Sequence, residues 1–192
     1  MIPASFNQNN SFVKGWHISN NVCDEVVNFY NNNKHRQTKG KTYGNAVKIS
    51  KDITILPNES LSVELQNYLS ELNSALDEYK KTFPFINEIG AWKISEGINI
   101  QKYEPNEAFF SVHCEVADIK RCSRMLVFMT YLNTVDNGGG TEFPFESLTL
   151  KAEKGLTVFF PAGWTHPHRG IVSSNQQKYI ITGWYNFVEA ES

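Results

Sequence analysis

Two stretches in the first third of the chain place apolar residues three and four positions apart, the spacing of one helix face. Residues 21–30 (NVCDEVVNFY) follow an Asn-rich region suited to a helix N-cap, and residues 61–83 follow the candidate caps Asn58 and Ser60. Residues 34–48 between them are basic and lack periodicity. We interpret this segment as an exposed, solvated loop, with contact to an anionic substrate as the alternative.

From Trp92 onward the pattern changes to short runs of apolar and aromatic residues, punctuated by Gly, Pro and Asn. The expected strands cover residues 97–103, 109–115, 125–132, 147–150, 156–160 and 179–187. Several short strands at this spacing favour a closed or double-sheet β core. No helix follows Gly138 to Gly140, so these glycines predict a tight turn beside the sheet rather than a phosphate-binding loop.

Composition adds few constraints. The length of 192 residues, with 41% hydrophobic residues, suits a single domain with an ample core. A net charge of −2 gives no reason to expect nucleic acid or an anionic membrane as a partner. The three cysteines form no plausible disulfide framework, no apolar run is long enough for a membrane span, and the N-terminus lacks the features of a signal peptide. We therefore expect a cytoplasmic protein.

The candidate chemistry lies in His113-Cys114-Glu115 and in the run from Trp164 to Gly170. Residues i and i+2 of a strand point to the same side, so His113 and Glu115 can reach one metal ion while Cys114 faces away. A further imidazole can come from the histidine-rich run about fifty residues later. Two imidazoles and one carboxylate are the ligands of a non-haem Fe(II) site with an open face.

The segments around these residues carry a more specific pattern. Residues 124–144 read RMLVFMTYLNTVDNGGGTEFP, residues 154–160 read KGLTVFF, and residues 168–184 read HRGIVSSNQQKYIITGW. This order resembles the 2-oxoglutarate/Fe(II)-dependent oxygenases, specifically the prolyl-4-hydroxylase-like branch, over residues 100–186. The chain departs from the family at Glu115, where the family has aspartate. The longer carboxylate can still bind iron, but it moves the metal or changes the mode of coordination.

The resemblance implies a mainly β fold with N-terminal helices and a double-stranded β-helix, or jelly-roll, core. We expect one domain over residues 1–192, in which residues 1–90 form a helical buttress and residues 91–188 the jelly roll with the metal site. The family's distal histidine precedes x-Gly and lies about ten residues before a basic residue. His168, followed by Gly170 and Lys178, satisfies both conditions, whereas His166 satisfies neither. His166 then lines the mouth of the site or caps a loop.

The resemblance also implies a receptor for 2-oxoglutarate, whose C5 carboxylate must meet a cation and hydroxyl groups deep in the barrel. Lys178 matches the family's basic residue, and Tyr103, Tyr131 and Thr141 match or extend its hydrogen-bond donors. The alternatives are a surface lysine and ordinary strand aromatics.

Three other positions keep two interpretations each. Arg124 either contacts substrate or a ligand, or merely opens a strand. Trp164 and Trp184 could flank the substrate mouth, although core packing is the safer interpretation for Trp184.

The expected function is that of an Fe(II)- and 2-oxoglutarate-dependent dioxygenase, with ascorbate as a candidate reductant. It would use dioxygen to hydroxylate a C–H bond of a protein residue or a small molecule, releasing succinate and CO2. The alternatives are a cupin-like metal-dependent enzyme or a binding protein that does not use 2-oxoglutarate. The sequence does not identify the substrate.

Overall fold

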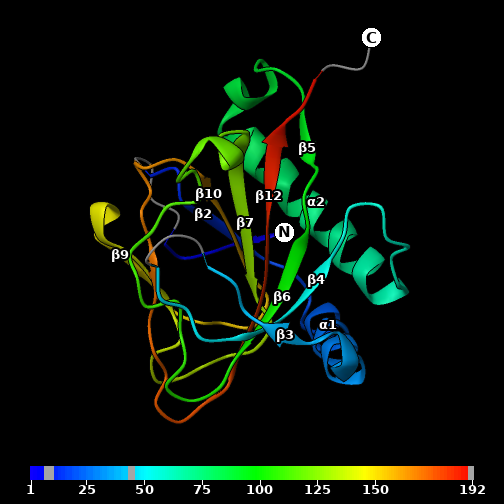
Figure 1. Ribbon diagram of the computed structural model, residues 1–192. Helices are drawn as coiled ribbons and strands as arrows, with labels where there is room; N and C mark the ends of the chain where they lie inside the picture. Colours follow the sequence, from blue (N-terminus) through cyan, green and yellow to red (C-terminus); the bar gives the residue numbers. More distant parts are fainter. Residues whose placement is uncertain (7–10, 43–45, 190–192) are drawn as a thin grey trace.

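A large antiparallel sheet forms the centre of the molecule (Figure 1). The computed structural model describes residues 1–6, 11–42 and 46–189, and within them nine strands join in the order β1-β2-β10-β7-β12-β6-β4-β3, with β5 paired to β12. Their bounds are β1 Ile2–Pro3, β2 Lys14–His17, β3 Thr38–Lys39, β4 Lys51–Ile55, β5 Trp92–Ile94, β6 Ile98–Tyr103, β7 Arg124–Tyr131, β10 Leu156–Pro161 and β12 Lys178–Phe187.

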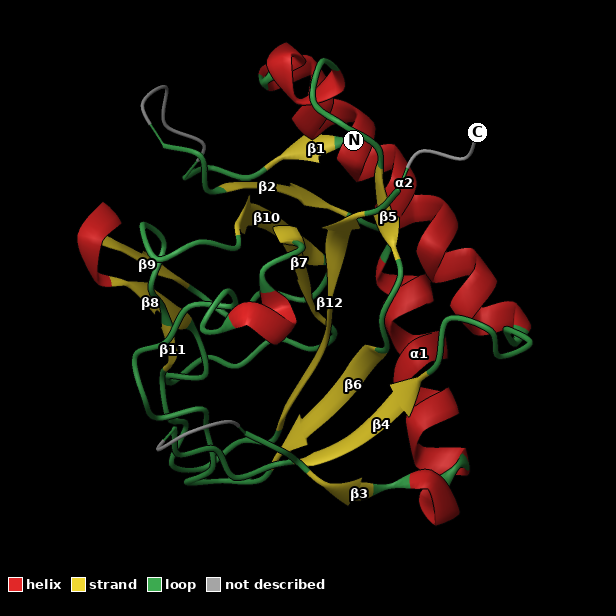
Figure 2. Ribbon diagram, turned by 45° about the horizontal axis from the view of Figure 1, so that its top comes forward, coloured by secondary structure: helices red, strands yellow, loops and turns green. Residues whose placement is uncertain are grey.

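A second, smaller sheet lies over one face of the large one. It contains β8 (Thr141–Phe143), β9 (Leu148–Leu150) and β11 (Arg169–Gly170) in the order β11-β8-β9. Helices α1 (Asn20–Asn32) and α2 (Val63–Thr82) cover the opposite face of the large sheet (Figure 2). The 3₁₀ turns η1 (Lys34–Arg36), η2 (Pro84–Asn87), η3 (Ile119–Arg121) and η4 (Pro144–Glu146) lie in the connections. This arrangement confirms the expected jelly roll with buttressing helices.

The two faces of the large sheet pack into two different cores, because successive side chains of a strand point to opposite sides. On β10, Phe159 packs with the helices in a core that includes Tyr68 and Leu72 of α2. Its neighbours Val158 and Phe160 instead pack between the two sheets. The helices therefore make one face of the sheet rigid and leave the other face to form the site.

Most predicted elements agree with the structure, but the details differ at several points. Both helices begin at serine caps, Ser19 and Ser62, and not at the predicted asparagine or at Ser60. The N-terminal third also supplies four strands that its sequence did not predict. Gly138 and Gly139 have positive φ and form the predicted turn. The segment 34–48 contains η1 and β3, and its residues 43–45 lie outside the described part of the chain.

The predicted strand over residues 109–115 is wrong. Only isolated bridges occur there, between Lys48 and Phe109 and between His113 and His168. Four other predicted strands match β6, β7, β10 and β12 to within one residue at each end, and β9 lies inside a fifth. Among the described residues, no helix has the combination of length and apolarity that crossing a membrane requires.

We expect Leu72→Ala to lower the free energy of unfolding by about 3 kcal/mol, because it leaves a cavity at a fully buried position under α2. The measurement is urea unfolding, with an unchanged m-value. The matched control is Asn73→Ala, which changes the exposed next residue of the same helix and should shift the free energy by less than about 0.5 kcal/mol. Equal effects of the two variants would show that α2 does not anchor the sheet.

Candidate metal and co-substrate site

The backbones of two loop segments bring the candidate histidines together. The amide of His113 donates to the carbonyl of His168 at 3.0 Å, and the amide of His168 donates back to His113 at 2.8 Å. Glu115 is held nearby, since its amide donates to the carbonyl of Ala162 at 3.1 Å. The ring of His113 also stacks on Phe109, with centroids 3.6 Å apart. These contacts fix two segments that are more than fifty residues apart in the chain.

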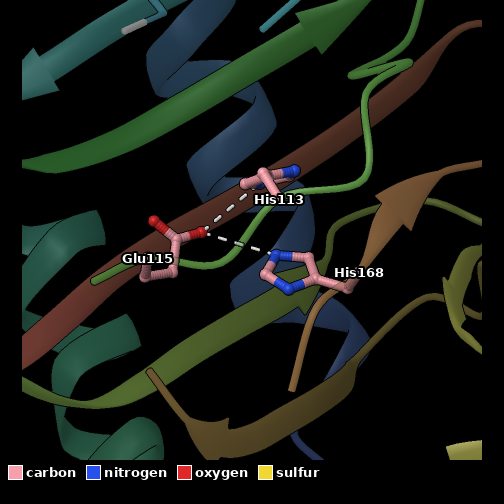
Figure 3. Close-up of side chains that lie close together, drawn as sticks. All are labelled: His113, Glu115 and His168. Atoms are coloured by element: carbon pink, nitrogen blue, oxygen red, sulfur yellow. Dashed lines mark ion pairs between the residues drawn. The ribbon is translucent and has the colours of Figure 1, made fainter. Parts of the chain in front are cut away.

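The side chains of His113, Glu115 and His168 converge on one point (Figure 3). Oε1 of Glu115 lies 3.6 Å from Nε2 of His113 and 3.4 Å from Nε2 of His168. Each residue offers one ligand atom within 4.8 Å of the others. First-row metal bonds of about 2.0–2.2 Å place neighbouring ligand atoms roughly 3 Å apart. The three residues could therefore hold one divalent metal ion.

The hydrogen bonds of the two imidazoles prepare them for this role. Nδ1 of His113 lies 2.9 Å from the carbonyl of Ser111, and Nδ1 of His168 lies 3.2 Å from the carbonyl of His166. A carbonyl only accepts, so each Nδ1 carries the proton and each Nε2 presents its lone pair to the common point. The donor set is two neutral imidazoles and one carboxylate, which suits Fe(II).

The second carboxylate oxygen of Glu115 has a different partner. Oε2 accepts a hydrogen bond from Nη1 of Arg124 at 3.1 Å, and Arg124 is itself held by two hydrogen bonds to Glu96, of 2.7 and 2.6 Å. Burial would raise the pKa of Glu115, but the contacts with His113 and His168 outweigh it and hold that pKa well below its ordinary value. Glu115 is therefore anionic, and only Oε1 is directed at the histidines.

Arg124 fulfils two of the roles considered for it. It begins β7, and its guanidinium both anchors Glu115 and lies 3.6 Å above the ring of Trp184. Trp184 lines the cavity and also packs against the inner core. Trp164, by contrast, is 76% exposed and does not line the cavity, so its predicted place at the mouth is not seen.

His166 also lies outside the cavity. It sits in a turn rather than an extended segment, so the alternation expected of a strand does not apply. Its Nε2 is 3.5 Å from a carboxylate oxygen of Glu146, and its ring meets the edge of Phe12. The interpretation of His166 as part of a loop is therefore the one that fits.

The cluster opens into a cavity of about 490 Å³ between the two sheets. Lys178 also lines this cavity, although only 5% of its surface is exposed. No carboxylate within the described residues pairs with it, and its Nζ lies 4.7 Å from the ring centroid of Tyr103. Burial lowers the pKa of Lys178 to about 8. A buried ammonium without a counter-charge is costly unless an anion occupies the space beside it.

The three predicted hydroxyl donors line the same cavity. The hydroxyl of Tyr131 shares a 2.6 Å hydrogen bond with Thr141, and the hydroxyl of Tyr103 donates to Gln101 at 2.7 Å. Burial raises the pKa of both tyrosines, so both stay protonated. The structure thus brings all seven predicted site residues into one space.

Sequence reasoning missed several polar residues that line the cavity from β4 and β6. Asp52, Thr54, Asn99 and Gln101 all do so, and Asp52 forms a buried ion pair of 2.6 Å with Lys48. A signal was present in residues 98–101, where Ile98 and Ile100 alternate with Asn99 and Gln101. Alternation of this kind predicts a polar face, but nothing in the sequence says that this face lines a cavity.

A jelly roll with such a cluster defines a class of metal-dependent enzymes with an open coordination face. Comparisons with known proteins narrow this class. The family model of the 2OG-Fe(II) oxygenase superfamily matches residues 98–186, which include the three candidate ligands and Lys178. The chain belongs to this superfamily and is a 2-oxoglutarate-dependent dioxygenase, for which Fe(II) and 2-oxoglutarate are the implied cofactor and co-substrate. No curated protein matches the sequence significantly.

Solved structures share the fold at low sequence identity. The viral collagen prolyl hydroxylase of Paramecium bursaria Chlorella virus-1, solved with 2-oxoglutarate, has a TM-score of 0.67 and 18% identity over 94% of this chain and 98% of its own. A Pseudomonas putida prolyl-4-hydroxylase has 0.69 and 13% over 94% and 95%. A Trichoplax adhaerens prolyl hydroxylase bound to a hypoxia-inducible-factor peptide has 0.68 and 18% over 93% and 84%.

We expect His168→Ala and Glu115→Ala to lower the affinity for Fe(II) at least about 100-fold, because each removes one of three ligands. Anaerobic titration with Fe(II), or with Co(II) as a spectroscopic probe, measures this loss. Glu115→Asp should still bind metal, since it retains the anionic group. His166→Gln is the matched control and should bind as the wild type does. Undiminished binding by Glu115→Ala would remove this carboxylate from the ligand set.

Proposed function

We propose that His113, Glu115 and His168 bind Fe(II), and that Lys178 binds the C5 carboxylate of 2-oxoglutarate, in an enzyme that hydroxylates a C–H bond. The observation that carries this proposal is the unpaired, buried Lys178 in the same cavity as the ligand cluster. A metal site alone would need no such cation. A dicarboxylate that reaches from the metal to Lys178 supplies the missing charge.

When both are bound, Fe(II) and 2-oxoglutarate supply the oxidative chemistry: dioxygen places one oxygen atom in succinate and the other in the product hydroxyl, while CO2 leaves. The residues of the chain bind, orient and exclude water. Glu115 contributes the anionic ligand, and Arg124 keeps its second oxygen occupied. Because Tyr131 and Thr141 share one hydrogen bond, one of the two hydroxyl protons stays available for a carboxylate.

We propose a prolyl residue in a peptide as the substrate. The names of the three similar structures support this choice, and the Trichoplax enzyme was solved with a peptide bound. The cavity offers an apolar wall for the reacting ring, formed by Val127, Ile180 and Trp184. A cupin-like enzyme or a binding protein without 2-oxoglutarate is not favoured, because neither accounts for the family match or for Lys178.

We further propose that residues 1–192 act as one catalytic domain. The packing of α1 and α2 against β10 and β12 in one shared core supports this. A cytoplasmic location is also proposed. It is supported by the three cysteines, of which Cys23, Cys114 and Cys122 are all free.

We expect Lys178→Met to raise the dissociation constant for 2-oxoglutarate at least about 100-fold, because it strands a buried carboxylate. The pH dependence is a second readout. Lys178 is protonated below a pKa of about 8, so the affinity is full there and falls as pH rises above about 8.

Lys178→Arg should remove this decline, since arginine stays charged over the whole range. Lys102→Met, on the neighbouring strand, is the control for loss of a lysine. Calorimetry at several pH values with Mn(II) in place of Fe(II) makes the measurement without turnover. A wild-type affinity that is constant from pH 7 to about pH 9.5 would contradict the assignment of Lys178.

The proposed substrate is tested by incubating the Fe(II)-loaded enzyme with 2-oxoglutarate, ascorbate and a pool of proline-containing peptides. We expect succinate and hydroxylated proline in equal amounts, the second detected by mass spectrometry. His113→Ala is the inactive control. Succinate formation that only free small molecules stimulate would retain the dioxygenase and reject the peptide substrate.

A further inference from the structure

A row of polar side chains crosses three strands on the cavity side of the large sheet. Asn99 of β6 lies directly opposite Thr54 of β4 and opposite Thr182 of β12, and all three line the cavity. The next residue across in this row is Met129 of β7, which is apolar. Three uncharged polar groups side by side on the inner face of a jelly roll have no role in core packing and face the space where a substrate must enter.

The hydrogen bonds within this row determine what it can offer to a ligand. Oγ1 of Thr54 donates to Oδ1 of Asn99 at 2.7 Å, and Oγ1 of Thr182 donates to the carbonyl of Phe128 at 2.9 Å. Both hydroxyl protons and the amide oxygen are therefore engaged. Nδ2 of Asn99 has no hydrogen-bond partner within the described residues, while both hydroxyl oxygens keep lone pairs. The row presents one N–H donor between two acceptors.

This pattern is complementary to a peptide group. A peptide group carries one acceptor, its C=O, and one donor, its N–H. A free carboxylate offers acceptors only, and an aliphatic group offers neither. A donor flanked by acceptors therefore distinguishes a main-chain amide from both. Proline has no N–H, so the recognised peptide group is one whose nitrogen belongs to a different residue.

The position of the row separates it from the co-substrate. Thr182 is four residues from Lys178 along β12, a distance of about 13 Å at the usual rise of a strand. A five-carbon diacid bound at Lys178 does not extend that far. The next cavity-facing residue of β12 beyond Thr182 is Trp184, which carries Arg124 on its ring. The row thus lies between the co-substrate pocket and the wall formed by Trp184.

We propose that Thr54, Asn99 and Thr182 bind a main-chain peptide group of the substrate, with Asn99 donating to its C=O and Thr182 accepting from its N–H. The inference rests on the proposed prolyl-peptide function. In this arrangement Thr54 is a positioning residue, because it fixes the amide of Asn99 so that Nδ2 faces the cavity. The row makes the enzyme select a proline next to a residue with an N–H.

Two probes differ in the required group. A short blocked (Pro-Pro-Gly) repeat peptide has main-chain N–H groups only at its glycines, whereas poly-L-proline has none inside the chain. We expect the wild-type enzyme to favour the glycine-containing peptide at least tenfold in kcat/KM. Thr182→Val removes the acceptor and should reduce this ratio to about one, mainly by raising KM for the glycine-containing peptide.

Asn99→Asp replaces the donor by an acceptor and should raise KM for both probes at least tenfold, because both contain the C=O. Asn73→Asp, an exposed position on α2, is the matched control and should change neither constant. Measuring the dissociation constant of 2-oxoglutarate for each variant separates damage to the co-substrate pocket from loss of substrate recognition.

Three outcomes would overturn the proposal: equal use of the two probes by the wild type, a wild-type ratio in Thr182→Val, or an unchanged KM in Asn99→Asp. If only free amino acids or other small acids stimulate succinate formation, peptide-group recognition is rejected while the dioxygenase function stands. If no succinate forms with any compound and 2-oxoglutarate does not bind, the function proposed for Lys178 fails first.

Discussion

The site depends on the pair of backbone hydrogen bonds that His113 and His168 exchange. Neither histidine lies in a regular strand that would hold it in register, although β11 begins directly after His168. The mutual bonds replace that register and join the segment after β6 to the small sheet. They bring the two imidazoles to within 4.4 Å of each other, measured between ring centroids, while the carbonyls of Ser111 and His166 turn both Nε2 atoms toward Glu115. The large sheet and its helices provide a rigid base for this junction.

The cavity has two charged regions that are stabilised in different ways. At one end Glu115, Arg124 and Glu96 form a chain of opposite charges, so each group has a partner before any ligand binds. At the other end Lys178 is buried and has no carboxylate partner among the described residues. Burying an unpaired charge is unfavourable, so the fold accepts a cost at Lys178 that an anion offsets. Glu115 explains the first arrangement, because its extra methylene lets one carboxylate face the histidines and Arg124 at once.

The sequence predicted the strands and helices that have clear periodicity, and it predicted the seven residues of the metal and co-substrate site. It failed where tertiary contacts override the local pattern. Residues 109–115 alternate like a strand, yet they are held only by bridges to Lys48 and His168. Likewise β2 has too few residues for a period to be visible, and its pairing with β10 decides its conformation. The role of Arg124 could not be predicted either, since its partners Glu96 and Glu115 are set by the fold and not by their spacing.

The polar row on β4, β6 and β12 shows how one sheet can serve two purposes. Ile98 and Ile100 pack on the helical side, and the residues between and after them face the cavity. Alternation therefore lets the packing of α1 and α2 hold the strands in register while Asn99 and Gln101 remain free of core packing. Because Thr54, Asn99 and Thr182 are directly paired across the strands, their relative positions follow from backbone hydrogen bonds rather than from flexible loops. A recognition surface built in this way loses little conformational entropy when it binds a peptide group, which is why three modest polar contacts can contribute to selectivity.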